Sequence, residues 1–279
     1  SIMMGAGQFL CIAAQQSAAS KAGGPSRAQN IGRLTLAIAV DALGADKVRC
    51  VMMPSPWTAQ MSLDDSREMV RRLGVQYDEI PIAAAMEQFA VSLAPTFASF
   101  GPRPDWDTTD ENLQARIRGM LLMALSNRTG RIVLTTGNKS EMAVGYATLY
   151  GDMAGGFAVI KDVFKTFVYR LADYRNSLSE VIPRNIIERA PSAELKPDQT
   201  DQDTLPPYAV LDAIIEAYME RDESPRQIIA GGIGEADVRK VVGMLKKNEY
   251  KRRQAPVGIR VTQRGFGKDW RYPITSAYA

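Results

Sequence analysis

The sequence predicts an α/β protein, with a parallel sheet flanked by helices and a helical region toward the C-terminal end. Between residues 34 and 136, short apolar runs alternate with longer segments whose apolar residues recur at helical spacing. Beyond Lys165 the strand pattern fades and helical spacing continues. Strands that are separated by helices are typical of a parallel sheet covered on both faces.

Helix and turn signals bound the predicted elements of the first half. Gly44 is expected to cap the first helix, and Pro54 to stop the strand that follows it. The segment Thr108–Glu111 has the pattern of a capping box and predicts the start of a long helix. The predicted strands are 48–53, 75–82 and 131–136, and the predicted helices are 34–43, 62–73, 83–93 and 109–127.

The second half is predicted to be helical apart from a connector and a tail. The connector, "PSAELKPDQTDQDTLPP", occupies residues 191–207, and the tail over 254–279 is rich in Gly, Arg and aromatic residues. The predicted helices or helical turns are 165–176, 183–189, 207–221, 225–230 and 235–247.

Composition limits the class of protein. The 279 residues, 46% of them hydrophobic, suffice for one large domain, or for one domain with a helical appendage. No apolar run reaches the roughly 20 residues that cross a bilayer and no secretory signal is recognisable, so we expect no membrane partner. Cys11 and Cys50 are too few for a disulfide framework, which favours a cytoplasmic location.

Charge and the absence of histidine narrow the chemistry further. The net charge is +3 with basic and acidic residues interleaved, so nucleic acid is not an expected partner. The basic cluster over 246–253 is interpreted either as a solvated helix end or as a contact with a phosphorylated ligand. The sequence contains no His, which excludes Ser-His-Asp and Cys-His nucleophilic sites and His-ligated metals. Any catalysis must therefore use Lys, Arg, carboxylates or hydroxyls, or a hard cation such as Mg²⁺.

Two polar segments, "MPSPWT" and "TGNKSE", follow predicted strands at the edge where parallel α/β sheets bind ligands. In the second segment Thr136 ends the strand, Asn138 or Ser140 is placed to cap the next helix, and Glu141 falls in its first turn. Hydroxyls, a flexible glycine and a carboxylate suit a nucleotide with Mg²⁺. A well-formed strand-to-helix turn explains the same pattern.

Further candidates come from spacing, and each has an ordinary structural alternative. Asn112 and Arg116 share one face of a predicted helix, which a solvated surface also explains. Asp152 lies in a glycine-rich loop. Lys165 opens a helix, where its charge opposes the helix dipole, so it is either fixed on a phosphate or a surface lysine. The acidic connector over 191–207 is either a solvated linker or a pinned segment.

Five sequence blocks together resemble one family, the NAD⁺ synthetases, and more narrowly the synthetase domain of the glutamine-dependent form. The blocks are "NLQARIRG", "LTTGNKSEMAVGYATLYGD", "KTFVYRLA", "PSAELKPDQTDQDTLPPY" and "KRRQAPVG", and the resemblance covers residues 34–279. It implies an ATP-pyrophosphatase of the adenine-nucleotide α-hydrolase type, a ligase that forms a C–N bond. In that family ATP adenylates the nicotinate carboxylate of deamido-NAD⁺, and ammonia then displaces AMP to give NAD⁺. A homodimer with substrate near the subunit interface is also implied.

The resemblance further implies roles for individual residues. Thr136 is expected to contact ATP, and Lys165 and Ser192 to bind the ATP phosphates. Glu141 is expected to ligate Mg²⁺, with Lys165 and Glu141 acting in catalysis. The candidates for binding deamido-NAD⁺ are Asn112, Arg116, Glu141, Asp152, Asp201 and Lys251.

Two departures from the family pattern matter. The N-terminal glutaminase domain of the glutamine-dependent enzymes is not in this sequence, so the chain is expected to use free ammonia or to be a piece of a longer polypeptide. The signature loop Ser-Gly-Gly-x-Asp-Ser should occupy residues 27–32, which read Arg-Ala-Gln-Asn-Ile-Gly, and the strand before it is expected to be missing too. Residues 1–33 are therefore treated as an anomalous segment, and residues 34–279 as the synthetase domain.

Three interpretations of this anomaly remain open. Residues 1–33 are a misread or frame-shifted segment, or the chain is a nucleotide-binding remnant that has lost its pyrophosphate loop. Amidation of another nucleotide carboxylate, as in GMP synthetase, is the third, and "NLQARIRG" and "KRRQAPVG" argue against it. A purely structural role is least favoured, because it needs no polar cluster at strand ends.

Overall fold

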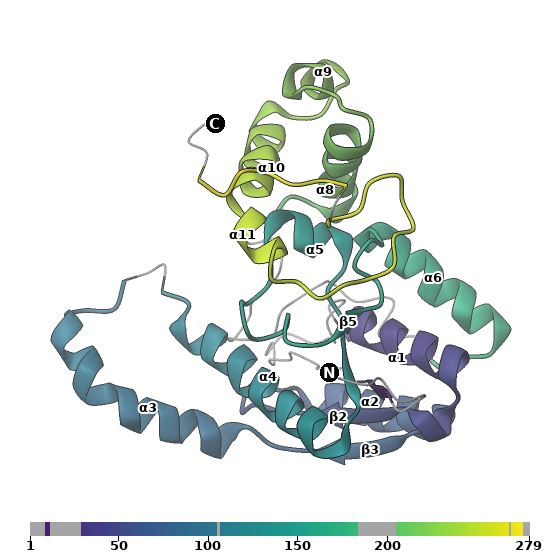
Figure 1. The fold of residues 1–279 in the computed structure, drawn as a ribbon, viewed down its shortest axis with the longest axis vertical. Coiled ribbons are helices and arrows are strands. Elements are labelled where there is room, and N and C mark those ends of the chain that lie inside the picture. Colours follow the sequence, from purple (N-terminus) through teal and green to yellow (C-terminus); the bar gives the residue numbers. More distant parts are fainter. Residues whose placement is uncertain (1–8, 12–28, 105–106, 184–204, 268, 276–279) are drawn as a thin grey trace.

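Strands and helices alternate along the first part of the chain, as the sequence predicts (Figure 1). The computed structural model describes residues 9–11, 29–104, 107–183, 205–267 and 269–275. The strands are β1 Phe9–Cys11, β2 Arg49–Met52, β3 Gln76–Glu79, β4 Ile132–Thr135 and β5 Phe157–Ala158. The helices are α1 Gln29–Leu43, α2 Gln60–Leu73, α3 Ala83–Phe97, α4 Thr109–Thr129, α5 Lys139–Val144, α6 Lys165–Leu178, α8 Tyr208–Ile215, α9 Pro225–Ala230, α10 Glu235–Lys247 and α11 Glu249–Arg252.

Strand β1 lies between β2 and β4. It pairs in parallel with β4 in a three-stranded sheet of order β1-β4-β5, and it lies next to β2, which pairs in parallel with β3 in a two-stranded sheet. Side by side, the two sheets place the strands in the order β3-β2-β1-β4-β5. Phe9–Cys11 of β1 aligns with Ile132–Leu134, whereas residues 17–26, where the expected strand is missing from the sequence, lie outside the described residues. A strand of three residues is too short to be recognised from its sequence pattern, because its conformation depends on the strand with which it pairs.

Alternate residues of the strands face two helical layers. Cys50 and Leu134 pack with α1, α2 and α6, whereas Val51 and Val133 pack with α3 and α4. This alternation is the geometry of a pleated strand. Because helices cover both faces there, β2 and β4 are apolar and buried along most of their length, whereas β3, with the sequence QYDE, is only partly buried.

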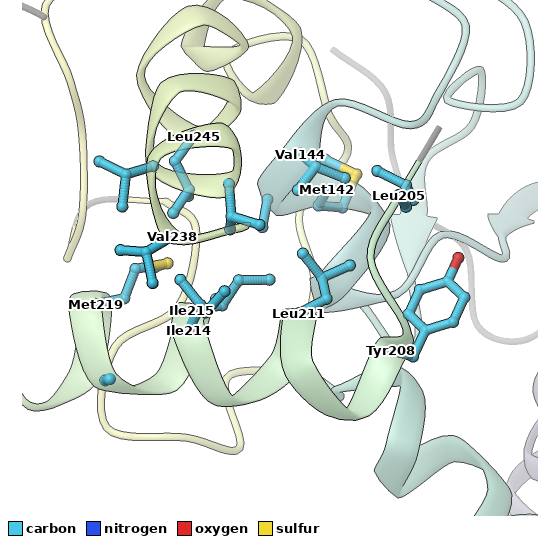
Figure 2. Packing of buried hydrophobic residues seen from close by; sticks show 14 of the residues in the cluster. Met142, Val144, Leu205, Tyr208, Leu211, Ile214, Ile215, Met219, Val238 and Leu245 are labelled. Carbon is cyan, nitrogen blue, oxygen red and sulfur yellow. The ribbon is translucent and has the colours of Figure 1, made fainter. Parts of the chain in front are cut away.

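The helical C-terminal region has a core of its own, which begins at the helix that follows β4. Its buried side chains come mainly from α5, α8 and α10, and include Met142, Val144, Leu211, Ile215, Val238 and Leu245 (Figure 2). Helix α8 continues into a π-helical turn, η4, over Glu216–Glu220. The stretch after α11, yellow in Figure 1, passes α5 and β5 and returns across α8 and α10. No helix in these described ranges is long and apolar enough to cross a bilayer.

Several local predictions are corrected. The Thr108 side chain makes no capping hydrogen bond, and the Asp107 carboxylate instead accepts from the Thr109 amide at 2.8 Å. Strand β5 and helix α11 were not predicted, because elements of two and four residues depend on their neighbours. The predicted start of the first helix at residue 34 is late, since α1 begins at Gln29 and includes residues 29–32. Helices α9 and α10 have their predicted bounds, and most of the 183–189 prediction lies outside the described residues.

Candidate active site

The candidate site lies where the strand order reverses. Successive connections lead from β1 outward through β2 to β3, and then return to β4 on the other side of β1. In open α/β sheets a ligand crevice forms at this point, beyond the carboxyl ends of the strands. Thr136 directly follows β4 there, and α5 begins three residues later. Residues 12–28 lie outside the described residues.

The turn between β4 and α5 is a complete capping box. The Asn138 side chain accepts from the Glu141 amide at 3.0 Å, and the Glu141 carboxylate accepts from the Asn138 amide at 3.2 Å. Asn138 is therefore the cap that the sequence analysis left open between two residues. The reciprocal bonds fix the Glu141 carboxylate at the first turn of α5.

Lys165 points its ammonium group at the same turn. It is the first residue of α6, it is 0% exposed, and its Nζ lies 3.1 Å from Glu141 Oε1. The ring of Tyr208 lies 5.0 Å from the same Nζ. The alternative of a surface lysine was wrong, because a carboxylate and an aromatic face surround the cation. The structure thus brings together Lys165 and Glu141, the two residues expected to act in catalysis.

Ser140 and Asp212 hold the start of α6, and the sequence analysis missed their role. The Ser140 hydroxyl accepts from the Lys165 amide at 2.9 Å and donates to the Asp212 carboxylate. The other oxygen of that carboxylate accepts from the Thr166 amide at 2.9 Å. Burial raises the pKa of Asp212, and its hydrogen bonds from Ser140 and Thr166 oppose the rise. No signal in the sequence pairs Ser140 with Asp212, because 72 positions separate them.

A second polar cluster joins residues that were expected to bind deamido-NAD⁺. The Asn112 side chain accepts from the Thr148 hydroxyl at 2.9 Å, and the Thr148 amide donates to Asp152 at 2.6 Å. The Arg116 guanidinium donates to the Leu149 carbonyl at 3.2 Å. Both α4 residues therefore contact the 148–152 loop, although Arg116 is exposed and Asn112 is partly exposed.

Lys251 of α11 closes this cluster from the C-terminal side. Its Nζ donates to the carbonyls of Gly145 and Ala147, both at 2.7 Å. Burial lowers the pKa of Lys251, and the nearby Asp152 partly opposes the fall. Arg252 is buried as well and donates to the Ala143 carbonyl at 2.7 Å. The basic cluster is therefore not a uniformly solvated helix end.

The remaining predicted site residues divide into two groups. Thr136 and Asp152 line the same narrow pocket of about 10 Å³, next to Arg118 and Gly119. Ser192 and Asp201 lie outside the described residues. Within the described ranges, no group of three or more Asp, Glu or Cys side chains is arranged to hold a metal ion.

Comparison with known proteins agrees with this architecture. The sequence model of the family described as NAD synthase matches residues 32–255. The chain belongs to the NAD synthase family. The glutamine-dependent NAD(+) synthetase of Acinetobacter baylyi is 56% identical over 247 residues, and that of Thermotoga maritima is 51% identical over 247 residues. These matches cover 88% of this chain but 45% and 42% of the two relatives, so the chain spans less than half of their length.

Solved structures place the fold within the same family. The glutamine-dependent NAD⁺ synthetase from Acinetobacter baumannii, determined in complex with ADP, is 47% identical with a TM-score of 0.57, and the match covers 96% of this chain and 45% of that one. An NH3-dependent NAD synthetase from Campylobacter jejuni is 22% identical with a TM-score of 0.62, and the match covers 88% of this chain and 86% of that one. The similarity to the Campylobacter jejuni enzyme concerns the fold alone. The expected adenine-nucleotide α-hydrolase architecture is confirmed.

Proposed function

We propose that this chain is a synthetase unit that amidates deamido-NAD⁺ to NAD⁺ at the expense of ATP. The observation that carries the proposal is the buried Lys165 held against Glu141 at the switch point of the sheet. The 56% identity to a glutamine-dependent NAD(+) synthetase supports the choice of reaction. Amidation of another nucleotide carboxylate is not favoured, since relatives at about half identity carry the same name.

The reaction divides into two balanced steps. The nicotinate carboxylate attacks the α-phosphorus of ATP, the bond to the β-phosphate oxygen breaks, and pyrophosphate leaves. Ammonia then attacks the acyl carbon of the adenylate, AMP departs with the bonding electrons, and one proton is lost to give the amide. Ammonia is already a nucleophile, so most of the rate enhancement comes from positioning and from stabilising negative charge.

Lys165 and Glu141 have separate roles in this proposal. The Lys165 ammonium lies in a low-dielectric site, where it stabilises charge that gathers on the departing pyrophosphate. Thr136 and Ser192 contact ATP and its phosphates. Glu141 would hold Mg²⁺ together with phosphate oxygens, which fits the usual preference of Mg²⁺ for one or two carboxylates plus substrate phosphates. Bound there, Mg²⁺ would neutralise phosphate charge.

The second polar cluster is assigned to deamido-NAD⁺. Asn112 and Arg116 of α4 and Lys251 of α11 contact the 145–152 loop, which carries Asp152. Glu141 and Asp201 complete the proposed set. Amide, guanidinium and ammonium groups match the hydroxyl and phosphate groups of a dinucleotide.

Ammonia supply, assembly and location belong to the same proposal. Ammonia comes either free from solution or from the glutaminase part that the longer relatives' name implies. We propose a homodimer whose substrate lies near the interface, supported by the exposed Met120, Met123 and Tyr150 around a pocket of about 590 Å³. A cytoplasmic location rests on the low number of cysteines, two in the chain, of which Cys50 is buried.

The test is a direct assay on protein whose N-terminal sequence has been verified by mass spectrometry. Incubation with ATP, Mg²⁺, deamido-NAD⁺ and ammonium is expected to yield NAD⁺, AMP and pyrophosphate in equal amounts. Nucleotide binding without any of these products would favour the remnant that lacks the pyrophosphate loop. Sedimentation of the same sample tests the homodimer.

A further inference from the structure

Lys139, the first residue of α5, is a buried lysine that the proposed mechanism does not use. Its side chain is 0% exposed, and its Nζ lies 2.8 Å from Asp162 and 2.7 Å from Glu220. It also donates to the Arg264 carbonyl at 2.8 Å and to the Thr262 hydroxyl. A cation at the N-terminal end of a helix opposes the helix dipole. The two carboxylates offset that cost and the cost of burial.

Asp162 ties the C-terminal stretch to the same place. One of its carboxylate oxygens accepts from the amides of Val261 and Thr262, both at 2.8 Å, and from the Thr262 hydroxyl. The other oxygen faces Lys139. The start of α5, the loop before α6 and the segment over 261–264 therefore meet at one buried ion pair.

Two ion pairs join the same two segments of the chain. The first segment carries Lys139 and Glu141, and the second carries Asp162 and Lys165. Lys139 pairs with Asp162, and Glu141 pairs with Lys165, so the order of the charges is reversed between the segments. The Lys139–Asp162 pair is 0% and 3% exposed at its side chains, whereas Glu141 is 14% exposed and reaches the site.

We infer that Lys139 and Asp162 are positioning residues that hold the two segments together while the Glu141–Lys165 pair opens to receive a nucleotide. This inference rests on the proposed function, in which Glu141 turns to a cation and Lys165 to a phosphate. When one of two links opens, the remaining link keeps both groups near their productive positions. Without it, the Lys165–Ser140 and Lys139–Val163 hydrogen bonds still join the two segments directly. Nucleotide binding must then also order their charged side chains, and affinity is lost to that cost.

The kinetic test uses Lys139→Met and Asp162→Asn, with Lys240→Met on the exposed face of α10 as the matched control. Both test variants are expected to raise KM for ATP about tenfold or more while kcat stays within about threefold. The control is expected to change neither parameter. A merely structural role would lower kcat with the folded fraction and leave KM for ATP unchanged, and that result would overturn the inference.

A second measurement needs no substrate, so it is independent of the proposed function. Urea unfolding is measured for Lys139→Met, Glu141→Gln and the double variant. Either pair alone keeps the segments joined, so the double variant is expected to lose more stability than the sum of the single losses. Additive losses would contradict the inference. If Lys139→Met does not fold, Asp162→Asn replaces it in the cycle, because its amide oxygen still accepts from Val261 and Thr262. If the wild-type chain forms no NAD⁺, the proposed function is refuted. The unfolding measurements would then still test whether the two ion pairs jointly hold the segments together.

Discussion

The ammonium group of Lys165 lies 3.1 Å from the carboxylate of Glu141, although 24 positions separate the two residues in the sequence. Each is fixed at the first turn of its own helix, Glu141 by the Asn138 cap and Lys165 by Ser140 and Asp212. The pair therefore rests on the backbone of α5 and α6, so its geometry is set before any ligand arrives. Such fixed charges are what electrostatic stabilisation of a transition state requires.

Removal of the Lys165 charge is expected to abolish most of the activity. In Lys165→Met the exchange of pyrophosphate into ATP in the presence of deamido-NAD⁺ should fall by about 100-fold or more, since one preorganised charge is lost from a buried site. The exchange is followed with labelled pyrophosphate, with Lys240→Met as the control. A rate of pyrophosphate exchange within about threefold of that of the unmodified chain would show that Lys165 has no role in the adenylation step.

Loss of the Ser140 hydroxyl is expected to destabilise the fold near the site. Ser140→Ala leaves the Lys165 amide without its acceptor and Asp212 without one donor, which costs about 1–3 kcal/mol for a buried group. The free energy of unfolding in urea measures this loss. Ser92→Ala, which removes an exposed hydroxyl bound to the Gln88 carbonyl, is the control. Equal losses in the two variants would show that the Ser140 network adds nothing.

Asp212 is expected to make stability depend on pH. Because burial raises its pKa, the folded chain binds more protons than the unfolded chain between the ordinary carboxyl pKa and the raised value. The free energy of unfolding therefore falls as pH rises through that window, from about pH 4 upward. In Asp212→Asn this contribution disappears, and urea midpoints measured from about pH 4 to 7 should show a flatter profile. An unchanged slope would mean that Asp212 keeps its ordinary pKa.

Asp152 is expected to affect one substrate and not the other. Asp152→Asn keeps an oxygen for the Thr148 amide but removes the charge beside Lys251, whose pKa should then fall further. KM for deamido-NAD⁺ is expected to rise about tenfold while KM for ATP stays constant. Asp173→Asn, on an exposed part of α6, is the matched control. An equal rise in both KM values would contradict the assignment of Asp152 to the dinucleotide.

Restoring the family loop is expected to raise activity. Residues 27–32 would be replaced by Ser-Gly-Gly-Ile-Asp-Ser, which supplies glycine amides for phosphates at the start of α1. Pyrophosphate exchange should increase by about 100-fold or more relative to the chain as written. Unchanged activity would show that the present residues suffice. Resequencing of the gene over the codons for 27–32 is the companion measurement, because an unambiguous in-frame read would rule out a misread segment.

Much of the fold follows from local pattern. The apolar runs around β2, β3 and β4, and the helical periods of α2, α9 and α10, lie close to their predicted bounds. The missed elements are short: β1, β5 and α11 have three, two and four residues. Their conformation depends on a paired strand or a packed helix, so a window of sequence holds too little information about them.

In the candidate site, too, some residues were predicted from the sequence, whereas several of their contacts were not. The residues Glu141 and Lys165 were predicted from motif and placement, and Asn138 from cap chemistry. By contrast, nothing in the sequence pairs Ser140 with Asp212 or Lys139 with Glu220, because those contacts span 72 and 81 positions. Buried polar groups find partners wherever the fold brings them, and sequence spacing does not record that.

By itself the sequence determined the family, the alternation of helices and strands, and the side chains available for chemistry without histidine. Only the tertiary structure decided that β1 pairs with β4 and lies next to β2, and that two reversed ion pairs join the start of α5 to the segment over 162–165. The physical reason is the range of the forces involved. Helix periods and caps act within a few residues of the chain, whereas strand order and buried ion pairs depend on distance in space.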